Sequence, residues 1–140
     1  MSQLYTRATT WLYGTLTSPP IAGVLDAYED YAPQGATDKD SVWIEYELMA
    51  PGDDVAEVAE QRIWTEFAFR VVACSRGRSR KALEPMADAI YTRLHRVSGS
   101  VAGGFVLSSV RTSEIAAGDL AQGVEYREIG GIFNLIVQPA

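Results

Sequence analysis

The sequence has very few of the residues that most often build catalytic or metal sites. Its 140 residues include one cysteine, Cys74, and one histidine, His95. A single cysteine excludes both a disulfide within the chain and a cysteine-based zinc site. A Ser-His-Asp or Cys-His site would have to use His95, whose place at the end of an expected helix favours a simple charge effect instead. We therefore expect no enzyme, no cofactor and no bound metal.

Basic residues and long apolar runs are also scarce. Lysine and arginine total 12 against 18 acidic residues, which gives a net charge of -6. This balance argues against a dedicated nucleic-acid binder, because phosphate contacts need a basic surface. We find no apolar run that could span a membrane and no signal peptide at the N-terminus. We therefore expect a soluble protein, made in a cytoplasm, that forms a single domain over residues 1–140.

The region from Arg62 to Arg96 is the best defined part of the sequence. Residues 62–74 alternate as a strand, with Cys74 as a buried small hydrophobe at its end. A basic loop follows, with four basic residues between Arg76 and Lys81. A helix is expected to begin near Arg80 to Ala82 and to end before Ser98-Gly99-Ser100, because Pro85 is tolerated only near a helix start. The expected core positions are Ile63, Thr65, Phe67, Phe69, Val71 and Ala73 on the strand, and Leu83, Met86, Ala87, Ile90, Leu94 and Val97 on the helix.

Weaker patterns define the remaining elements. We expect a helix over 2–17, a short edge strand over 21–25, a long loop over 26–40 and strands over 41–49, 105–114 and 124–138. Pro51 to Asp54 predicts a turn, and 55–61 a loop or one helical turn. The core phase changes along 124–138, which predicts a bulge at Gly130-Gly131. The predicted fold is α+β, with two main helices packed on a mostly antiparallel sheet of about four to five strands.

Two surfaces are candidates for function. Trp43, Trp64 and Met49 fall on the non-core face of their strands, so either the N-terminal helix with Trp11 or another subunit is expected to cover that face. The candidate subunit or partner interface comprises Trp43, Trp64, Glu66, Arg70, Arg76, Arg78, Arg80 and Lys81. The second surface is an acidic loop formed by Asp53, Asp54, Glu57 and Glu60. Its spacing does not match a calcium loop, which favours a solvated loop.

The order of elements resembles the tail terminator or tail-completion proteins of tailed phages. The matching parts are 65–74, the following loop, the helix from Ala82 to Arg96, and 123–137 with Tyr126, Gly130-Gly131 and Phe133. The N-terminal helix before Ser18-Pro19-Pro20 and a strand near Val24 also fit. The acidic insert 51–61 and the loop 26–40 depart from the pattern.

The resemblance implies a structural virion protein of the tail or neck. Such a protein forms a ring, usually a hexamer, and can be monomeric before assembly. It contacts the tail tube protein and a head-completion or connector protein, while DNA passes through without sequence-specific binding. We place the acidic loop in the lumen or against a neighbouring ring. Two alternatives stay open: a head–tail connector or stopper, and a small dimeric α+β domain that binds a regulatory ligand.

Overall fold

The chain folds into two helices and one six-stranded sheet. The computed structural model describes residues 3–33, 37–38, 40–58, 61–121 and 124–139, with side chains described except at 3, 50–63 and 119–125. The predicted α+β class is confirmed, and the sheet has six strands instead of four to five. The elements are α1 (Gln3–Thr17), β1 (Ala27–Glu29), β2 (Val42–Val58), β3 (Gln61–Arg76), α2 (Arg80–Leu94), β4 (Val97–Val101), β5 (Gly104–Ala121) and β6 (Val124–Pro139).

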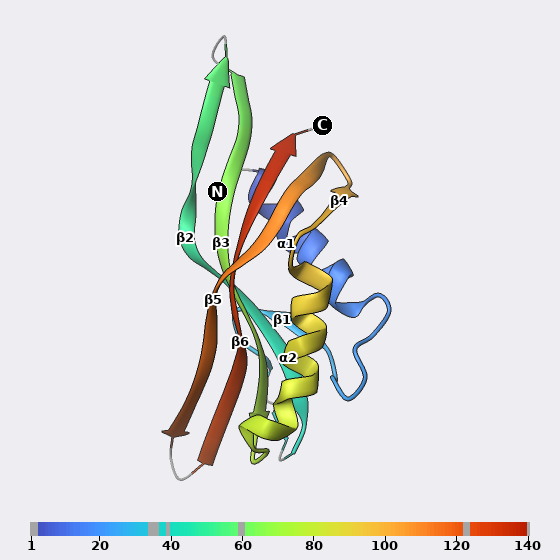
Figure 1. Cartoon of the computed structure of the whole chain (residues 1–140), viewed down its shortest axis with the longest axis vertical. Coiled ribbons are helices and arrows are strands. Elements are labelled where there is room, and N and C mark those ends of the chain that lie inside the picture. Colours follow the sequence, from blue (N-terminus) through green and yellow to red (C-terminus); the bar gives the residue numbers. More distant parts are fainter. Residues whose placement is uncertain (1–2, 34–36, 39, 59–60, 122–123, 140) are drawn as a thin grey trace.

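Two long hairpins dominate the sheet. The strand order is β1-β2-β3-β6-β5-β4, and all neighbours are antiparallel except β1 and β2. The β2–β3 hairpin and the β5–β6 hairpin cross near the middle of the molecule and extend in opposite directions (Figure 1). This arrangement is a strong form of the twist that all sheets have.

The central pair, β3 and β6, explains why the predicted alternation holds. Its register runs without interruption from Thr65 opposite Val137 to Arg76 opposite Tyr126. Because side chains alternate between faces along a strand, odd-numbered residues of both strands face the same layer. Phe67, Phe69, Phe133 and Leu135 are all buried there, as the pattern predicts for β3.

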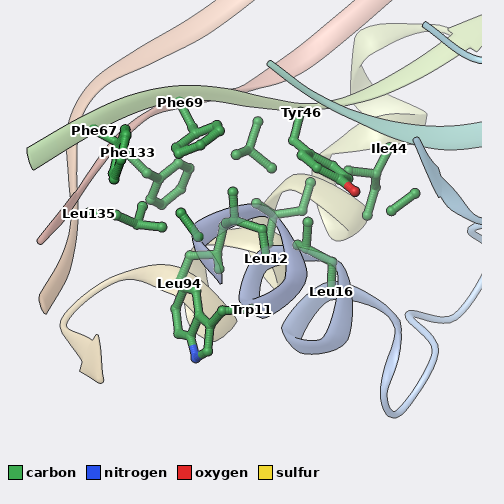
Figure 2. Close-up of a cluster of buried hydrophobic side chains, with 14 of the residues drawn as sticks. Trp11, Leu12, Leu16, Ile44, Tyr46, Phe67, Phe69, Leu94, Phe133 and Leu135 are labelled. Atoms are coloured by element: carbon green, nitrogen blue, oxygen red, sulfur yellow. The ribbon is translucent and has the colours of Figure 1, made fainter. Parts of the chain in front are cut away.

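Both helices pack on this inner face and form the main core with it (Figure 2). Each fully buried large side chain contributes about 1.5–3 kcal/mol relative to exposure. Tyr5 of α1 lies against the rings of Phe67 and Phe69, at centroid distances of 6.3 and 6.1 Å. The helical residues of this core include Leu4, Ala8, Trp11, Leu12 and Leu16 from α1 and Leu83, Ile90 and Leu94 from α2.

The predicted start of α2 is confirmed, but the helix ends at Leu94 and does not reach the predicted core position Val97. Ser79 caps the helix, since its Oγ accepts a hydrogen bond from the Ala82 N–H at 3.2 Å. The helix ends at Leu94 because Arg96 takes a left-handed conformation, with φ 58°, and its N–H donates to the Ser109 carbonyl. The chain then continues as β4, so the segment from Ser98 to Ser100 is part of a strand.

Arg93 links the two helices. Its Nη1 lies 3.2 Å from the carbonyl oxygens of both Thr15 and Leu16, and it also contacts the Pro19 carbonyl. The last carbonyls of α1 have no partner within that helix. A guanidinium at this position therefore satisfies them and complements the negative end of the helix dipole.

The segment between α1 and β2 differs from its prediction. Residues 21–25 form turns instead of an edge strand, although Ile21 is buried in the core. The edge strand is β1, inside the predicted loop, and Ala27 pairs with Ile44 in parallel register. The apolar run thus holds one buried core residue, but the predicted strand at 21–25 is wrong. None of the helices in the described ranges is long and apolar enough to cross a membrane.

The predicted turn at Pro51 to Asp54 is wrong. These residues lie within β2, which continues to Val58 and pairs with β3 through several register shifts. The predicted loop or helical turn at 55–61 is likewise replaced by strand as far as Val58, with β3 starting at Gln61. A bulge accommodates turn-forming residues inside a strand, because the extra residue leaves the regular ladder. β5 also runs past its predicted end, to Ala121.

The bulge predicted at Gly130-Gly131 is also wrong, because β6 pairs with β3 in continuous register. The two glycines allow close approach instead. A Cβ at Gly130 would lie 2.1 Å from the Val71 carbonyl oxygen, and one at Gly131 would lie 2.5 Å from the Ser113 oxygen. The apparent change of phase has a different cause: Tyr126 packs in a second apolar cluster on the outer face.

Candidate functional site on the outer face of the sheet

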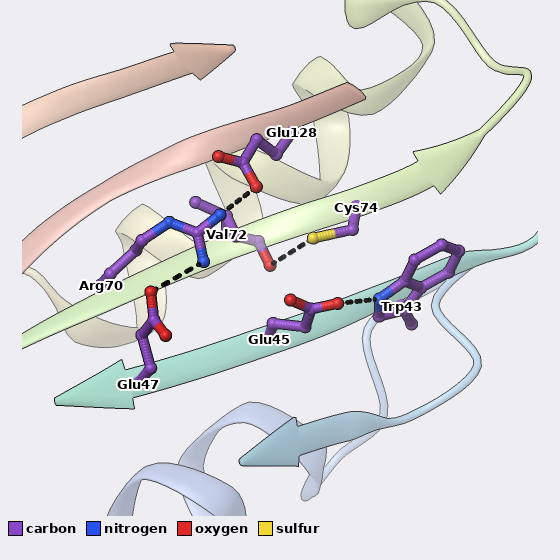
Figure 3. A network of polar contacts seen from close by, with 7 residues as sticks. All are labelled: Trp43, Glu45, Glu47, Arg70, Val72, Cys74 and Glu128. Atoms are coloured by element: carbon purple, nitrogen blue, oxygen red, sulfur yellow. Dashed lines mark hydrogen bonds and ion pairs between the residues drawn. The ribbon is translucent and has the colours of Figure 1, made fainter. Parts of the chain in front are cut away.

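The outer face of the sheet carries an ion-pair cluster that joins three strands. Arg70 of β3 lies between Glu47 of β2 and Glu128 of β6 (Figure 3). Its Nη1 is 3.5 Å from Glu47 Oε1, and its Nη2 contacts Glu128. The Arg70 side chain is only 15% exposed, so solvent screens these contacts less than it would at an open surface.

Glu45 adds a further carboxylate beside this cluster. The indole Nε1 of Trp43 donates a hydrogen bond of 2.7 Å to Glu45 Oε2. Burial raises the pKa of Glu45; the Trp43 hydrogen bond and Arg70 act in the opposite direction, and Glu128 and Glu47 add to the rise. With Glu45, Glu47 and Glu128 around Arg70, acidic groups outnumber this basic group.

Trp43 is the centre of a small apolar cluster on the same face. Trp43, Val72 and Cys74 are buried there, and Tyr28, Ala32, Ile115 and Tyr126 pack around them. Trp43 is 2% exposed. Trp43 therefore needs no cover from α1, which packs on the inner face, or from another subunit. Met49 is 50% exposed, so cover of that part of the face by another subunit stays a prediction.

A cavity of about 280 Å³ opens beside this cluster. Its lining combines two carboxylates, two aromatic rings, one guanidinium and one thiol. Burial raises the pKa of Cys74, so the thiol stays protonated and unreactive, as its predicted packing role requires. The lining residues are Trp43, Glu45, Cys74, Ala117, Gly118, Tyr126, Arg127 and Glu128.

The chemistry of this cavity suits binding better than catalysis. The two carboxylates and the aromatic rings favour a cationic group of a ligand or a partner side chain, while Arg127 adds one positive charge to the same lining. His95 lies elsewhere: its Nδ1 accepts a hydrogen bond from the Arg111 N–H at 3.1 Å, and its ring stacks on Tyr91. Within the described residues, no group of three His, Cys, Asp or Glu side chains could hold a metal ion.

The structure does not gather the predicted interface residues into one patch. Trp43 lies opposite Cys74, ten residues along β3 from Trp64, which corresponds to roughly 33 Å at the rise of a strand. Glu66 is exposed, Trp64 is half-buried, and Arg70 is held by its ion pairs. Only part of the predicted surface is therefore free for a partner.

The basic loop is found where it was predicted, between β3 and α2. Arg78 Nε donates to the Asp40 carbonyl, while Arg80 and Lys81 are exposed in the first turn of α2. Arg76 ends β3 opposite Tyr126, which lines the cavity. The loop thus lies next to the acidic outer face.

The predicted acidic loop is part of a strand. In β2, Asp53 lies opposite Glu66 of β3 and Asp54 lies opposite Thr65. Glu57 lies opposite Arg62. The side chains of these three acids, and all of Glu60, lie outside the described residues. The predicted loop is therefore wrong for Asp53, Asp54 and Glu57, whose backbone belongs to the far part of the β2–β3 hairpin.

Sequence reasoning missed the carboxylates that surround Arg70. Glu45 and Glu47 alternate with the core residues of β2, which was a usable signal that they share the outer face. Glu128 could not be found in this way, because only the register of β6 against β3 brings it opposite Cys74.

The chain matches neither a protein-family model nor a curated protein sequence.

Proposed function

We infer that this chain is a structural virion protein of a tailed phage, a ring-forming tail terminator that caps the tail tube. It stops polymerisation of the tube and joins the tail to the head-completion proteins. The observation that carries this proposal is the pair of long hairpins that extend in opposite directions (Figure 1). A two-stranded ribbon is only marginally stable alone in water. Hairpin arms of this length are therefore suited to packing against neighbouring molecules.

Charge supports the same proposal. The net charge of -6 lets DNA pass a ring without adhering to its wall, because like charges repel. The acidic run from Asp53 to Glu60 belongs to the β2–β3 hairpin and its connection, and in this proposal it faces the lumen or a neighbouring ring. The adjacent acidic and basic surfaces of the outer face supply complementary contacts between neighbouring subunits.

Mass photometry and negative-stain imaging of the purified chain test the proposal. A ring of six copies has a mass of about 92 kDa, six times 15.3 kDa, and shows a central channel. If the free chain is monomeric, rings should appear at the ends of purified tail tubes. A chain that forms no ring in either setting contradicts the proposal.

A second experiment tests the acidic run separately. Asp53→Asn, Asp54→Asn, Glu57→Gln and Glu60→Gln together remove its charge. If rings of this variant assemble and package DNA normally, the lumenal role of these residues is wrong while the ring itself stands. A head–tail connector or stopper would also form a ring but would bind the head-completion side without stopping tube growth.

The cavity beside Trp43 favours one different class of function. A volume of about 280 Å³ with acidic and aromatic walls suits a small cationic ligand in a dimeric regulatory domain. A dimer whose melting temperature rises with such a ligand would support that class, since binding to the native state alone stabilises it.

A further inference from the structure

The edge of β5 is covered along only its first part. β4 pairs with β5 from Val101 opposite Gly104 to Val97 opposite Ser109. Arg96 N–H then donates to the Ser109 carbonyl at 2.7 Å, and the Arg111 N–H donates to His95 Nδ1. Beyond that point, the described residues include no strand that pairs with the second edge of β5.

The uncovered part is also regular. From Ser113 opposite Ile132 to Ala121 opposite Val124, β5 pairs with β6 without a register shift. These nine residues span about 30 Å at the rise of a strand. They include no proline and two charged residues, Glu114 and Asp119. A long, straight edge with so few charges is a template for another strand.

The opposite edge of the sheet is built differently. β1 covers β2 only from Ile44 to Tyr46. Further along, β2 contains Pro51, and its pairing with β3 shifts after Leu48, Ala50, Asp54 and Ala56. Prolines, bulges and charges are the devices by which natural edges avoid pairing. The free edge of β2 is therefore a poor partner for the free edge of β5.

We propose that residues 113–121 of β5 pair with the same segment of a second copy, antiparallel and across a two-fold axis at Ala117. The strand then meets a partner that is equally regular. This register places Ser113 opposite Ala121, Glu114 opposite Leu120, and Ile115 opposite Asp119. Neither acidic residue faces another acid, whereas a centre at Glu114 would place two glutamates in direct opposition. The two sheets join into one of twelve strands.

This contact is isologous and does not rest on the proposed phage function. A two-fold pair can coexist with a ring only as the contact between two stacked rings. The symmetry of the assembly therefore distinguishes the two proposals, because the β5 contact is two-fold and the proposed phage protein forms a ring. Ala117 and Gly118 also line the cavity beside Trp43, so the second copy lies at the rim of that cavity.

Disulfide crosslinking tests the register directly. In a Cys74→Ala background, Ala117→Cys places two thiols opposite each other at a Cα separation of about 4.5–5.5 Å, within the range of a disulfide. We expect a crosslinked species of about 31 kDa, twice 15.3 kDa, under mild oxidation. Ala116→Cys is the matched control: its counterpart lies on the diagonal, at roughly 7–8 Å, and should crosslink far less.

Proline substitution tests the edge itself. Amides along an antiparallel strand alternate between the two neighbours, so only one of Ala116→Pro and Ala117→Pro removes an N–H that faces the free edge. The variant that keeps the wild-type melting temperature should elute as a monomer, measured by light scattering. The other should lose stability, because it breaks the pairing with β6.

Three outcomes overturn the proposal. A wild-type chain that is monomeric at high concentration has no such contact. Crosslinking at Ala116 as strong as at Ala117 indicates random collision. Single rings without a crosslink at Ala117 disprove the two-fold pair while supporting the proposed phage function.

Discussion

The two long hairpins differ in where their strand pairing shifts register. In the β2–β3 hairpin the register shifts lie in the far part, after Leu48, whereas β5 shifts at Leu107 and Thr112 and is then regular to its end. β6 contains no extra residue against either of its neighbours. Irregular pairing is therefore concentrated in the outer strands, and the β3–β6 pair at the crossing point stays regular. The crossing point defines the fold, while the arms differ in the regularity of their pairing.

The largest expected effect comes from disturbing the crossing point. A Cβ at Gly130 would lie 2.1 Å from the Val71 carbonyl oxygen, and the backbone of β3 cannot move away without breaking its own ladder. We expect Gly130→Ala to lower the free energy of unfolding by about 3 kcal/mol or more, measured by urea denaturation. The control is Gly14→Ala in α1, where nothing lies within 4 Å of the added Cβ. It should stabilise by about 0.5–1 kcal/mol. Equal stabilities for both variants would contradict the close approach of β3 and β6.

A smaller loss should follow when the hairpins are disconnected on the outer face. Arg70→Met removes the guanidinium that contacts both Glu47 of one hairpin and Glu128 of the other. The carboxylates then repel each other without compensation. We expect a loss of about 1–2 kcal/mol, below the range for fully buried pairs, because both acids are partly exposed. The control, Glu114→Gln, breaks an exposed pair with Arg111 and should cost less than about 0.5 kcal/mol. A similar loss in both variants would mean that Arg70 does not join the hairpins.

The crossing region was the part of the fold that the sequence predicted best. The alternation around Phe67 and Phe69 and the stripe of Leu83, Ile90 and Leu94 have one strong period each, and burial decides their face. These five residues are buried, whereas the predicted core positions Met86 and Ala87 are only partly buried. Sequence pattern is reliable where one face of an element is apolar over several turns or pleats.

The arms were predicted poorly because local turn chemistry competes there with pairing across strands. Pro51 to Asp54 has the composition of a turn, and Ser98 to Ser100 that of a helix stop. Both nonetheless lie in strands, where Asp53 pairs with Glu66 and Ser100 pairs with Phe105. The sequence did not predict the candidate site because that site also depends on how the strands pair. Arg70 meets Glu128, 58 residues away, only through the register of β3 and β6. No local pattern contains that information.

The outer face also predicts a dependence on pH. Burial, with Glu128 and Glu47 nearby, raises the pKa of Glu45 above its unfolded value. A raised carboxyl pKa means that the folded state holds the proton more tightly. The contribution of this carboxyl group to the free energy of unfolding is therefore fully present below its unfolded pKa of about 4.3. It is lost as pH rises through the folded pKa.

Glu45→Gln should therefore be more stable than the wild type at pH 7, with the difference fading near pH 4. The Gln amide oxygen can still accept the Trp43 hydrogen bond. Urea denaturation across this pH range measures the effect, and Glu66→Gln, at an exposed position of the same face, should show a weaker trend. A constant difference at all pH values would show that the carboxyl is not destabilised by its surroundings.

The smallest expected effect on stability tests why the free edge of β2 is less suited to pairing than the free edge of β5. Pro51 lies in β2 within the register shift between Ala50 and Asp53 and has no N–H to offer a neighbouring strand. If such features guard this edge, Pro51→Val should leave the free energy of unfolding within about 0.5 kcal/mol but increase self-association, because β-branched residues favour pairing. Light scattering over a concentration series measures the change. Thr112→Val, at a bulge of β5 that already adjoins the open edge, should change association less. If Pro51→Val assembles no more than the wild type, the bulges alone are enough to keep the free edge of β2 from pairing with another strand. The difference between the two arms then lies in backbone register and not in the proline.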